Sequence, residues 1–441
     1  MTKISKDSKK NLKSKTLEKT SRRDFFKKTA IYSASALTAA TVLAPIKLKA
    51  DDENIVNHVE WGTKLGDKVD KYHYGIPSPY EHNNIRRVHD LLSSGDRYAT
   101  VSMTPLHQQE GIITPNGLFF NRSHGGVAQI DPNKFRLMIH GLVKKPIVLT
   151  LEQLKRYPSE SRIHFIECPA NGSTGWRGPQ FNNLQFVKGM MSSAEWTGVK
   201  LSVLLEDLGL KPEAQWALVE GSDNSEMGRT IPVEKILDDA MLVWGQNGEP
   251  LRPEQGYPVR LLVPGWEGNL NVKWVKRIEF SDKPWHSKEE TSKYTMLQPN
   301  GKAINFFWPM EVNSIITSPC PEVPWTDLKI GDMVEISGIA WSGRGTIKTV
   351  DISLDGGKNW IEAPLKGLVL PKSWTRFSYI IKWDGKKKVL LSRAIDDSGH
   401  IQPSIDKLVE NVGVEGVYHR NPIVGWEVTS KGVVNNVHVR S

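Results

Sequence analysis

Residues 164–172 read His-Phe-Ile-Glu-Cys-Pro-Ala-Asn-Gly, and they place a cysteine where a short apolar run ends and a loop begins. The run from Ile163 to Glu167 predicts a β-strand, and the glycine-containing sequence after Cys168 predicts a turn. Functional side chains are often found where a rigid element passes into a loop. A thiolate at Cys168 could therefore act as a nucleophile or bind a soft metal ion.

Three other interpretations of this cysteine remain open from the residues alone. A zinc site would need further ligands, but on a strand His164 and Cys168 lie on one face and Glu167 on the other, which suits a tetrahedral site poorly. Cys168 could also be an inert buried side chain. The chain has one other cysteine, Cys320 in a proline-rich run, so a disulfide between the two is the third alternative.

The segments on either side of this stretch alternate between extended and helical patterns. Phe135–His140 and the continuous apolar run Val259–Val263 predict strands, whereas Leu201–Leu208 has helical spacing and ends at Gly209. We therefore expect residues 115–302 to form a mixed α+β domain. Residues 51–114 are polar with little periodicity, which predicts an N-terminal wrap with short helices.

Residues 303–441 have a different character, because short strand-like runs alternate with turn clusters. The runs are Met333–Ile336, Thr349–Leu354, Phe377–Trp383 and Val389–Ser392. Strands of this length and spacing predict a β-sandwich. Residues 353–360 also match the S-x-D-x-G-x-x-W box of β-propellers. A propeller needs several copies and the chain has one, so we expect a hairpin turn there.

The first 50 residues carry the basic character of the chain. They hold 13 of the 58 lysines and arginines and three of the 49 acidic residues, so the remainder is close to neutral and predicts no nucleic-acid partner. Arg22 and Arg23 precede an apolar stretch, Ala30–Ala44, that is too short for a relaxed membrane span. This pattern resembles a twin-arginine signal peptide. It predicts export to a bacterial periplasm, a mature start near Asp51 and no stable membrane anchor.

The sequence lacks the motifs of several common cofactors. No C-x-x-C-H occurs, so the chain itself attaches no c-type haem, and no glycine-rich nucleotide-binding pattern follows a predicted strand. With 39% hydrophobic and 24% charged residues, the composition is that of a globular protein, which excludes a largely disordered chain and a polytopic membrane protein.

Six ordered blocks resemble the sulfite oxidase family of molybdenum enzymes. They are Arg122–His124, Cys168–Asn171, Gly189–Val199, Glu220–Asp223, Gly256–Arg260 and Asn271–Trp274. Three further runs, at residues 245–249, 252–258 and 289–294, are similar to those of the molybdenum subunits of Sox sulfane dehydrogenases. The resemblance implies an α+β fold, in which a molybdopterin domain is followed by an Ig-like β-sandwich that mediates dimerisation. It also implies a Mo-molybdopterin cofactor.

The resemblance assigns roles to individual residues. Cys168 corresponds to the thiolate ligand of the metal, and a soft sulfur ligand suits such a centre. Arg122 and His124 match residues that contact the pterin and face the substrate channel, and Tyr294 matches a tyrosine on the substrate side of the metal. The other positions implied to hold the cofactor are Gly189, Asp223, Gln255, Arg260 and Lys273. The cations among them suit the cofactor's phosphate.

The sequence departs from animal sulfite oxidases on the substrate side. Gly172 and Ser173 stand where those enzymes have two arginines, so fewer cations are available and we expect weaker binding of free sulfite. The C-terminal domain offers Arg420 as the candidate for a distal arginine. The residues expected to be catalytic are Arg122, Tyr294 and Arg420.

The function implied is oxidation of sulfane sulfur or sulfite in the periplasm, as part of the Sox system of thiosulfate oxidation. The electrons would pass singly to a c-type cytochrome subunit, and a sulfur-carrier protein would present the substrate. The chain would form a homodimer within a hetero-oligomer. Three alternatives are a stand-alone sulfite dehydrogenase, an S- or N-oxide reductase of the same fold, and a binding protein whose cofactor site has decayed.

Overall fold

The computed structural model describes residues 65, 68, 73–176 and 178–439. Residues 78–441 and residues 1–77 are two separate units, and the helices and strands described below belong to the former. The signal peptide predicted for residues 1–50 lies outside the described residues. No helix within the described part of the chain is long and apolar enough to cross a membrane.

A three-stranded antiparallel sheet begins the larger unit. Its order is β1 (Arg87–Val88), β2 (Thr100–Met103) and β3 (Asn121–Ser123). Short 3-10 helices flank these strands, at η3 (Pro79–Glu81), η4 (Asp90–Leu92), η5 (Leu106–Gln108) and η6 (Asn116–Leu118). Three of these helices, η3, η4 and η5, lie within residues 51–114, where short helices were predicted; the N-terminal wrap itself stays a prediction. The pairing of β2 with β3 sets Val101 opposite Arg122, so this sheet fixes the backbone of one predicted site residue.

Two five-stranded sheets form the next part of the unit. The first has the order β11 (Glu249–Pro250), β10 (Met241–Gln246), β7 (Met191–Lys200), β6 (Glu160–Glu167), with β12 (Arg260–Leu262) also paired to β10. The second has the order β5 (Ile147–Leu149), β4 (Leu137–Gly141), β13 (Val275–Ser281), β8 (Trp216–Gly221), β9 (Gly228–Pro232). The strands predicted at Ile163–Glu167 and Val259–Val263 fall on β6 and β12.

Short helices connect these strands. They are α2 (Leu151–Leu154), α3 (Leu184–Lys188), α4 (Leu201–Leu208), α5 (Val233–Asp238) and α6 (Lys288–Thr291). Helix α4 spans the predicted residues and ends at Gly209, whose φ of +67° favours glycine. Its four leucines are buried, because residues spaced three or four apart share one face of a helix. The mixed α+β prediction is confirmed.

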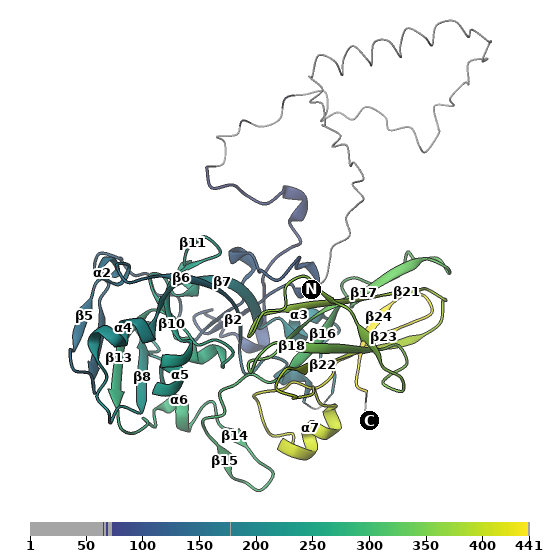
Figure 1. The fold of residues 1–441 in the computed structure, drawn as a ribbon. Helices are drawn as coiled ribbons and strands as arrows, with labels where there is room; N and C mark the ends of the chain where they lie inside the picture. The colour runs from purple at the N-terminus through teal and green to yellow at the C-terminus, as the bar shows by residue number, and fades with distance from the viewer. Residues whose placement is uncertain (1–64, 66–67, 69–72, 177, 440–441) are drawn as a thin grey trace, which may run out of the picture. The chain divides into compact units, whose positions relative to one another are not determined.

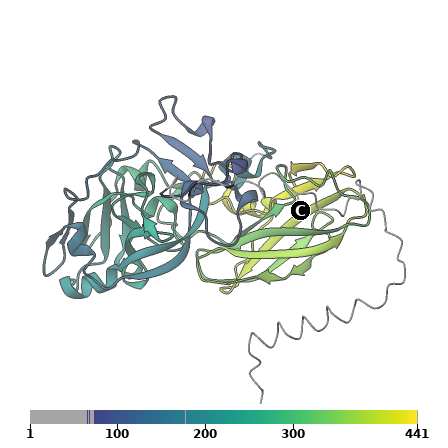
Figure 2. The ribbon, with the colours of Figure 1, turned by 90° about the horizontal axis from the view of Figure 1, so that it is seen from above.

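The C-terminal residues form a sandwich of two antiparallel sheets. One is β16 (Asn313–Ser318), β17 (Met333–Trp341), β21 (Thr375–Lys382), β20 (Leu365–Lys366). The other is β19 (Ile361–Ala363), β18 (Ile347–Ser353), β22 (Lys388–Asp396), β23 (Gly425–Val428), β24 (Val434–Val437). Helix α7 (Ile405–Val412) connects β22 to β23, and the hairpin β14 (Met296–Leu297) and β15 (Ala303–Ile304) precedes the sandwich. The predicted β-sandwich is confirmed, and these strands gather beside those of the α+β part (Figures 1 and 2).

The predicted turn at residues 353–360 joins β18 to β19. Asp355 accepts hydrogen bonds from the backbone N–H of Asn359 at 3.0 Å and from its side chain at 2.7 Å. Gly356 and Gly357 follow with φ values of +75° and +95°, which a side chain would strain. The motif therefore serves as a hairpin turn here, as predicted.

A few side chains of the α+β part pack into the hydrophobic core of the sandwich. Phe165 of β6 and Leu184 and Val187 of α3 pack in the same cluster as buried side chains of the sandwich, such as Ile339 and Ala394. The indole of Trp341 on β17 also donates a 2.7 Å hydrogen bond to the buried carboxylate of Glu167. The strand that leads to Cys168 is therefore held from both sides.

Candidate active site

Cys168 follows directly on the last residue of β6. Its backbone N–H bonds to the carbonyl of Met190 at 3.0 Å. The side chain of Asn171 ties the turn together, since its amide donates to Glu167 Oε1 at 2.9 Å and to the carbonyl of Lys188 at 3.1 Å. The same side chain accepts from the backbone of Met190 at 3.2 Å. The asparagine thus holds the cysteine-bearing turn in one conformation.

One cavity gathers seven of the ten predicted site residues. They are Arg122, His124, Cys168, Gln255, Arg260, Lys273 and Tyr294. These residues come from β3, β12, the end of β6 and the loops between, so segments far apart in sequence meet at one place. Phe119, Phe120 and Ile166 supply apolar walls. A cavity with apolar walls and a few converging polar groups is typical of a cofactor or substrate site.

Arg260 is buried in this cavity without a carboxylate partner among the described residues. Its guanidinium donates to the carbonyls of Gln255 at 3.0 Å and Asn271 at 2.9 Å and lies 5.1 Å from the ring centre of Trp196. Its Nε has no hydrogen-bond partner in the described part of the chain. Burial lowers the pKa of Arg260 to about 9.

Lys273 is the second cation of this cavity, and it is half-buried. Its ammonium donates to Asn121 Oδ1 at 2.9 Å and to the carbonyls of Glu254 and Arg122 at 3.0 and 3.1 Å. Burial and then the nearby Arg260 lower the pKa of Lys273 to about 7. The lowered pKa values mean that the charged forms of Arg260 and Lys273 are destabilised in this cavity. A bound anion would stabilise these charged forms and raise both pKa values again. A cofactor with a phosphate fits this cavity.

The thiol of Cys168 also needs a ligand to ionise. Without a metal, burial raises the pKa of Cys168 to about 11, so the side chain is protonated at neutral pH. A soft metal ion would displace that proton, because a metal-bound thiol is deprotonated. No group of three or more His, Cys, Asp or Glu side chains in the described residues could hold a metal by itself, so the zinc site is not seen there. Cys168 and Cys320 are both free, so the disulfide is not seen either.

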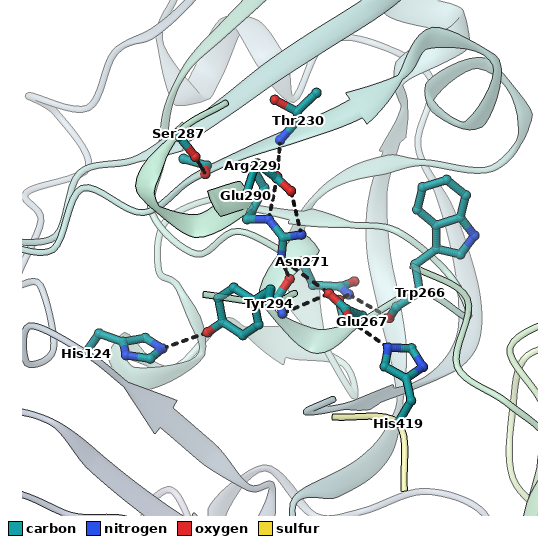
Figure 3. A network of polar contacts seen from close by, with 12 residues as sticks. His124, Arg229, Thr230, Trp266, Glu267, Asn271, Ser287, Glu290, Tyr294 and His419 are labelled. Carbon is teal, nitrogen blue, oxygen red and sulfur yellow. Dashed lines mark hydrogen bonds and ion pairs between the residues drawn. The ribbon is translucent and has the colours of Figure 1, made fainter. Parts of the chain in front are cut away.

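Tyr294 closes the cavity from the loop after α6. Its hydroxyl lies 3.2 Å from Nε2 of His124, and Figure 3 shows the ring between His124 and Arg229. Burial, then Arg122 and Lys273, lower the pKa of His124 to about 3. Burial raises the pKa of Tyr294. The tautomer of the imidazole decides which of the two groups donates in this hydrogen bond.

Three predicted site residues do not line the cavity. Gly189 ends α3, where an added Cβ would lie 2.2 Å from the carbonyl oxygen of Gln185, so close packing accounts for this glycine. Asp223 accepts from the hydroxyl of Ser225 and acts on Lys273 only through its charge. Arg420 packs its guanidinium against Gly175 behind the cysteine loop. Their predicted contacts with cofactor or substrate stay predictions.

Several polar residues near the cavity were not predicted from the sequence to be functional. Arg229, Glu267, Glu290 and His419 form a buried network under Tyr294 (Figure 3). Asn271 joins the cavity lining and accepts from the backbone of Val263 at 2.7 Å. Asn271 stands in one of the blocks that carry the resemblance, so that block offered a signal. Glu290 likewise stands in the quoted run 289–294, whereas Arg229 and Glu267 stand in none of the quoted blocks.

Comparisons with known proteins agree with this architecture. The model of the "Oxidoreductase molybdopterin binding domain" matches residues 124–289, and that of the "Mo-co oxidoreductase dimerisation domain" matches residues 305–425. The crystal structure of the sulfane dehydrogenase SoxCD from Paracoccus pantotrophus superimposes with a TM-score of 0.86 at 46% identity, over 89% of this chain and 100% of that chain. The chain belongs to the sulfite oxidase family. Its predicted fold and Mo-molybdopterin cofactor are thereby confirmed.

More distant members of the sulfite oxidase family are longer proteins. Mitochondrial sulfite oxidase from Rattus norvegicus is 30% identical over 355 residues, which are 74% of this chain and 63% of the rat protein. The NADH nitrate reductase from Solanum lycopersicum is 30% identical over 377 residues, 75% of this chain and 40% of the plant protein. The chain thus spans less than two thirds of the length of these relatives.

Proposed function

We propose that this chain is the molybdenum subunit of a periplasmic enzyme that oxidises sulfane sulfur or sulfite. The observation that carries the proposal is the cavity at Cys168, which brings its thiol together with Arg260 and Lys273, two cations without a carboxylate partner among the described residues. The similarity to a sulfane dehydrogenase supports the sulfur substrate. The sequence holds no C-x-x-C-H, which favours a separate c-type cytochrome subunit as the electron acceptor, as in the Sox system.

When bound, the molybdopterin supplies two-electron oxygen-atom transfer to sulfur. Cys168 would ligate the metal as a thiolate, and Arg260 and Lys273 would bind the phosphate and polar ring atoms of the cofactor. The carbonyls that now accept from Arg260 and Lys273 keep both cations aimed into the cavity. Gln255, whose amide donates to the carbonyl of Phe120 at 3.1 Å, fixes the wall between them.

The substrate side is formed by Arg122, His124 and Tyr294. The neutral imidazole of His124 holds the phenol of Tyr294 at 3.2 Å, so the phenol keeps one orientation. Arg122 donates to the carbonyl of Ser123 at 2.7 Å, and its remaining N–H groups can meet an anionic oxygen on the substrate. Of these three side chains Tyr294 is buried, whereas Arg122 is half-buried and His124 is exposed.

Two features favour a carrier-bound sulfane over free sulfite. Gly172 and Ser173 bring no cation to the loop, and Arg420 does not line the cavity of Cys168. A charge-assisted hydrogen bond contributes about 1.5–3 kcal/mol, so each one missing weakens binding of a small dianion by about tenfold or more. A sulfane on a carrier protein depends less on this pocket, because protein contacts hold it.

The test is a comparison of kcat/KM for sulfite and for a persulfidated carrier protein, each with and without the cytochrome subunit. We expect the carrier substrate to be preferred and turnover with cytochrome to exceed turnover without it. Efficient sulfite oxidation by the lone chain, at a rate that the carrier does not exceed, would instead establish a stand-alone sulfite dehydrogenase. Turnover only of an S- or N-oxide with a reductant would establish the reductase.

We propose export by the twin-arginine route, on the basis of Arg22 and Arg23 and the apolar stretch after them. The double variant Arg22→Lys and Arg23→Lys keeps both charges but loses the guanidinium pair, so we expect precursor to accumulate in the cytoplasm. Fractionation and immunoblotting measure this, with Lys27→Arg and Lys28→Arg as the control. Normal periplasmic levels of the double variant would contradict the route.

A further inference from the structure

Arg229 lies at the centre of the polar network under Tyr294. It stands on β9 and its side chain is 1% exposed. Its Nε donates to Glu290 Oε1 at 2.8 Å and its Nη2 to Glu290 Oε2 at 3.3 Å, which is a two-pronged pair. Its Nη1 donates to Glu267 Oε2 at 3.3 Å and to the side-chain oxygen of Asn269. The guanidinium carbon lies 4.9 Å from the ring centre of Tyr294.

The two carboxylates connect Arg229 to different parts of the chain. Glu290 belongs to α6, four residues before Tyr294, and also accepts from the backbone of Thr230 at 3.0 Å. Glu267 reaches the C-terminal segment, because its Oε1 lies 2.7 Å from Nε2 of His419. The backbone N–H of His419 in turn donates to the carbonyl of Pro169 at 2.8 Å, directly after Cys168. Figure 3 shows this order from Tyr294 through Arg229 and Glu267 to His419.

The residues at both ends of the network have strained backbones. Tyr294 has a φ of +48° and His419 a φ of +53°, a region that costs free energy for residues other than glycine. Such conformations persist only where the surroundings hold them. The hydrogen bond between Tyr294 and His124 restrains the phenol end of the ring, and Arg229 contacts the ring face.

We propose that Arg229 is a positioning residue that holds Tyr294 over the cavity of Cys168. It does so by stacking on the ring and by anchoring α6 through Glu290, while Glu267 and His419 fix the C-terminal segment on the same support. The kinetic part of this proposal rests on the function proposed above, whereas the structural part does not. A buried ion pair that only stabilised the fold would leave the orientation of Tyr294 unaffected.

The experiment is a double-mutant cycle between Arg229→Lys and Tyr294→Phe. Lysine keeps the charge but loses the planar two-pronged geometry. We expect kcat for sulfite, and for a persulfidated carrier, to fall about tenfold or more in the otherwise unchanged protein. In the Tyr294→Phe background the same change should alter kcat less than about twofold, because Arg229 acts through the tyrosine. Equal losses in both backgrounds would overturn the proposal.

The matched control is Arg277→Lys on β13. Arg277 forms an ion pair with Glu220 at 2.8 Å and does not line the cavity. We expect the kcat of the Arg277→Lys variant to stay within about twofold of that of the unchanged protein. A loss equal to that of Arg229→Lys would count against a specific role. If Arg229→Lys does not fold, Glu290→Gln replaces it in the double-mutant cycle. Glutamine is nearly isosteric with glutamate, and it weakens the ion pair between Arg229 and Glu290 by removing the charge of the carboxylate.

A second readout needs neither turnover nor cofactor. Amide hydrogen exchange in the molybdenum-free protein should become faster at residues 290–296 in Arg229→Lys, because the support of the strained segment is lost. Exchange at β13 should remain unchanged. If the unchanged protein turns over neither substrate, the proposed function fails while this measurement still decides the role of Arg229. Unchanged exchange at residues 290–296 would overturn the positioning role.

Discussion

At the scale of single residues, Cys168 is the residue that we propose as the ligand of the metal. Replacing it by serine exchanges a soft thiolate for a harder and more basic hydroxyl, so we expect turnover to be abolished while the fold is retained. Circular dichroism, molybdenum content and steady-state assays measure these outcomes. Cys320→Ser is the control, because Cys320 is buried in the core of the sandwich and outside the cavity; its turnover number should not change. Activity like that of the unchanged protein in Cys168→Ser would show that Cys168 is not the ligand.

Lys273 makes the stability of the cofactor-free protein depend on pH. Its folded-state pKa of about 7 lies below the ordinary value of 10.5, so between these values the unfolded chain binds the extra proton. Stability contributed by this group therefore rises with pH from about 7 to 10.5 and is least below pH 7. We expect Lys273→Met to flatten this part of the stability curve in urea unfolding, whereas Lys366→Met at an exposed position should not. If the dependence of stability on pH were the same in Lys273→Met, the lowered pKa of Lys273 would be contradicted.

At the scale of elements, the contact between β6 and β17 holds the cysteine-bearing strand. Trp341→Phe removes the donor that Glu167 accepts from across the two domains, and the buried carboxylate loses a partner. We expect the free energy of unfolding to fall by about 1–3 kcal/mol more than in a control that loses only indole packing. Trp374→Phe is that control, because Trp374 is equally buried and its Nε1 has no partner among the described residues. Equal losses in denaturant unfolding would refute a role for the hydrogen bond.

At the scale of the whole molecule, the C-terminal sandwich is expected to join two copies of the chain. Residues 305–425 match a dimerisation domain, and two-fold pairing is the commonest symmetric assembly. One chain has a mass of 49.6 kDa, so light scattering of the purified full chain at micromolar concentration should give about twice that mass. The mass of one chain under conditions in which the enzyme is active would contradict a functional homodimer.

Local pattern and ordered motifs by themselves determined much of this protein. The spacing of Leu201–Leu208 and the apolar run that leads to Cys168 predicted a helix and a strand, and the protein contains both, because periodicity follows directly from backbone geometry. The alternating runs after residue 303 predicted the sandwich for the same reason. The motif blocks identified seven residues that the fold brings into one cavity.

Only the tertiary structure decided which charges meet. Arg229 pairs with Glu290 across 61 positions of sequence, and Glu267 meets His419 across 152. Such contacts leave no periodic signal, because they depend on how the sheets and the C-terminal segment pack. The same packing set Arg420 behind the loop at Gly175, outside the cavity for which it was predicted. The sequence alone thus determined the elements and most of the residues that line the cavity at Cys168. Long-range packing decided the charges that support this cavity, since only the packing of the whole chain brings residues so far apart in sequence within bonding distance.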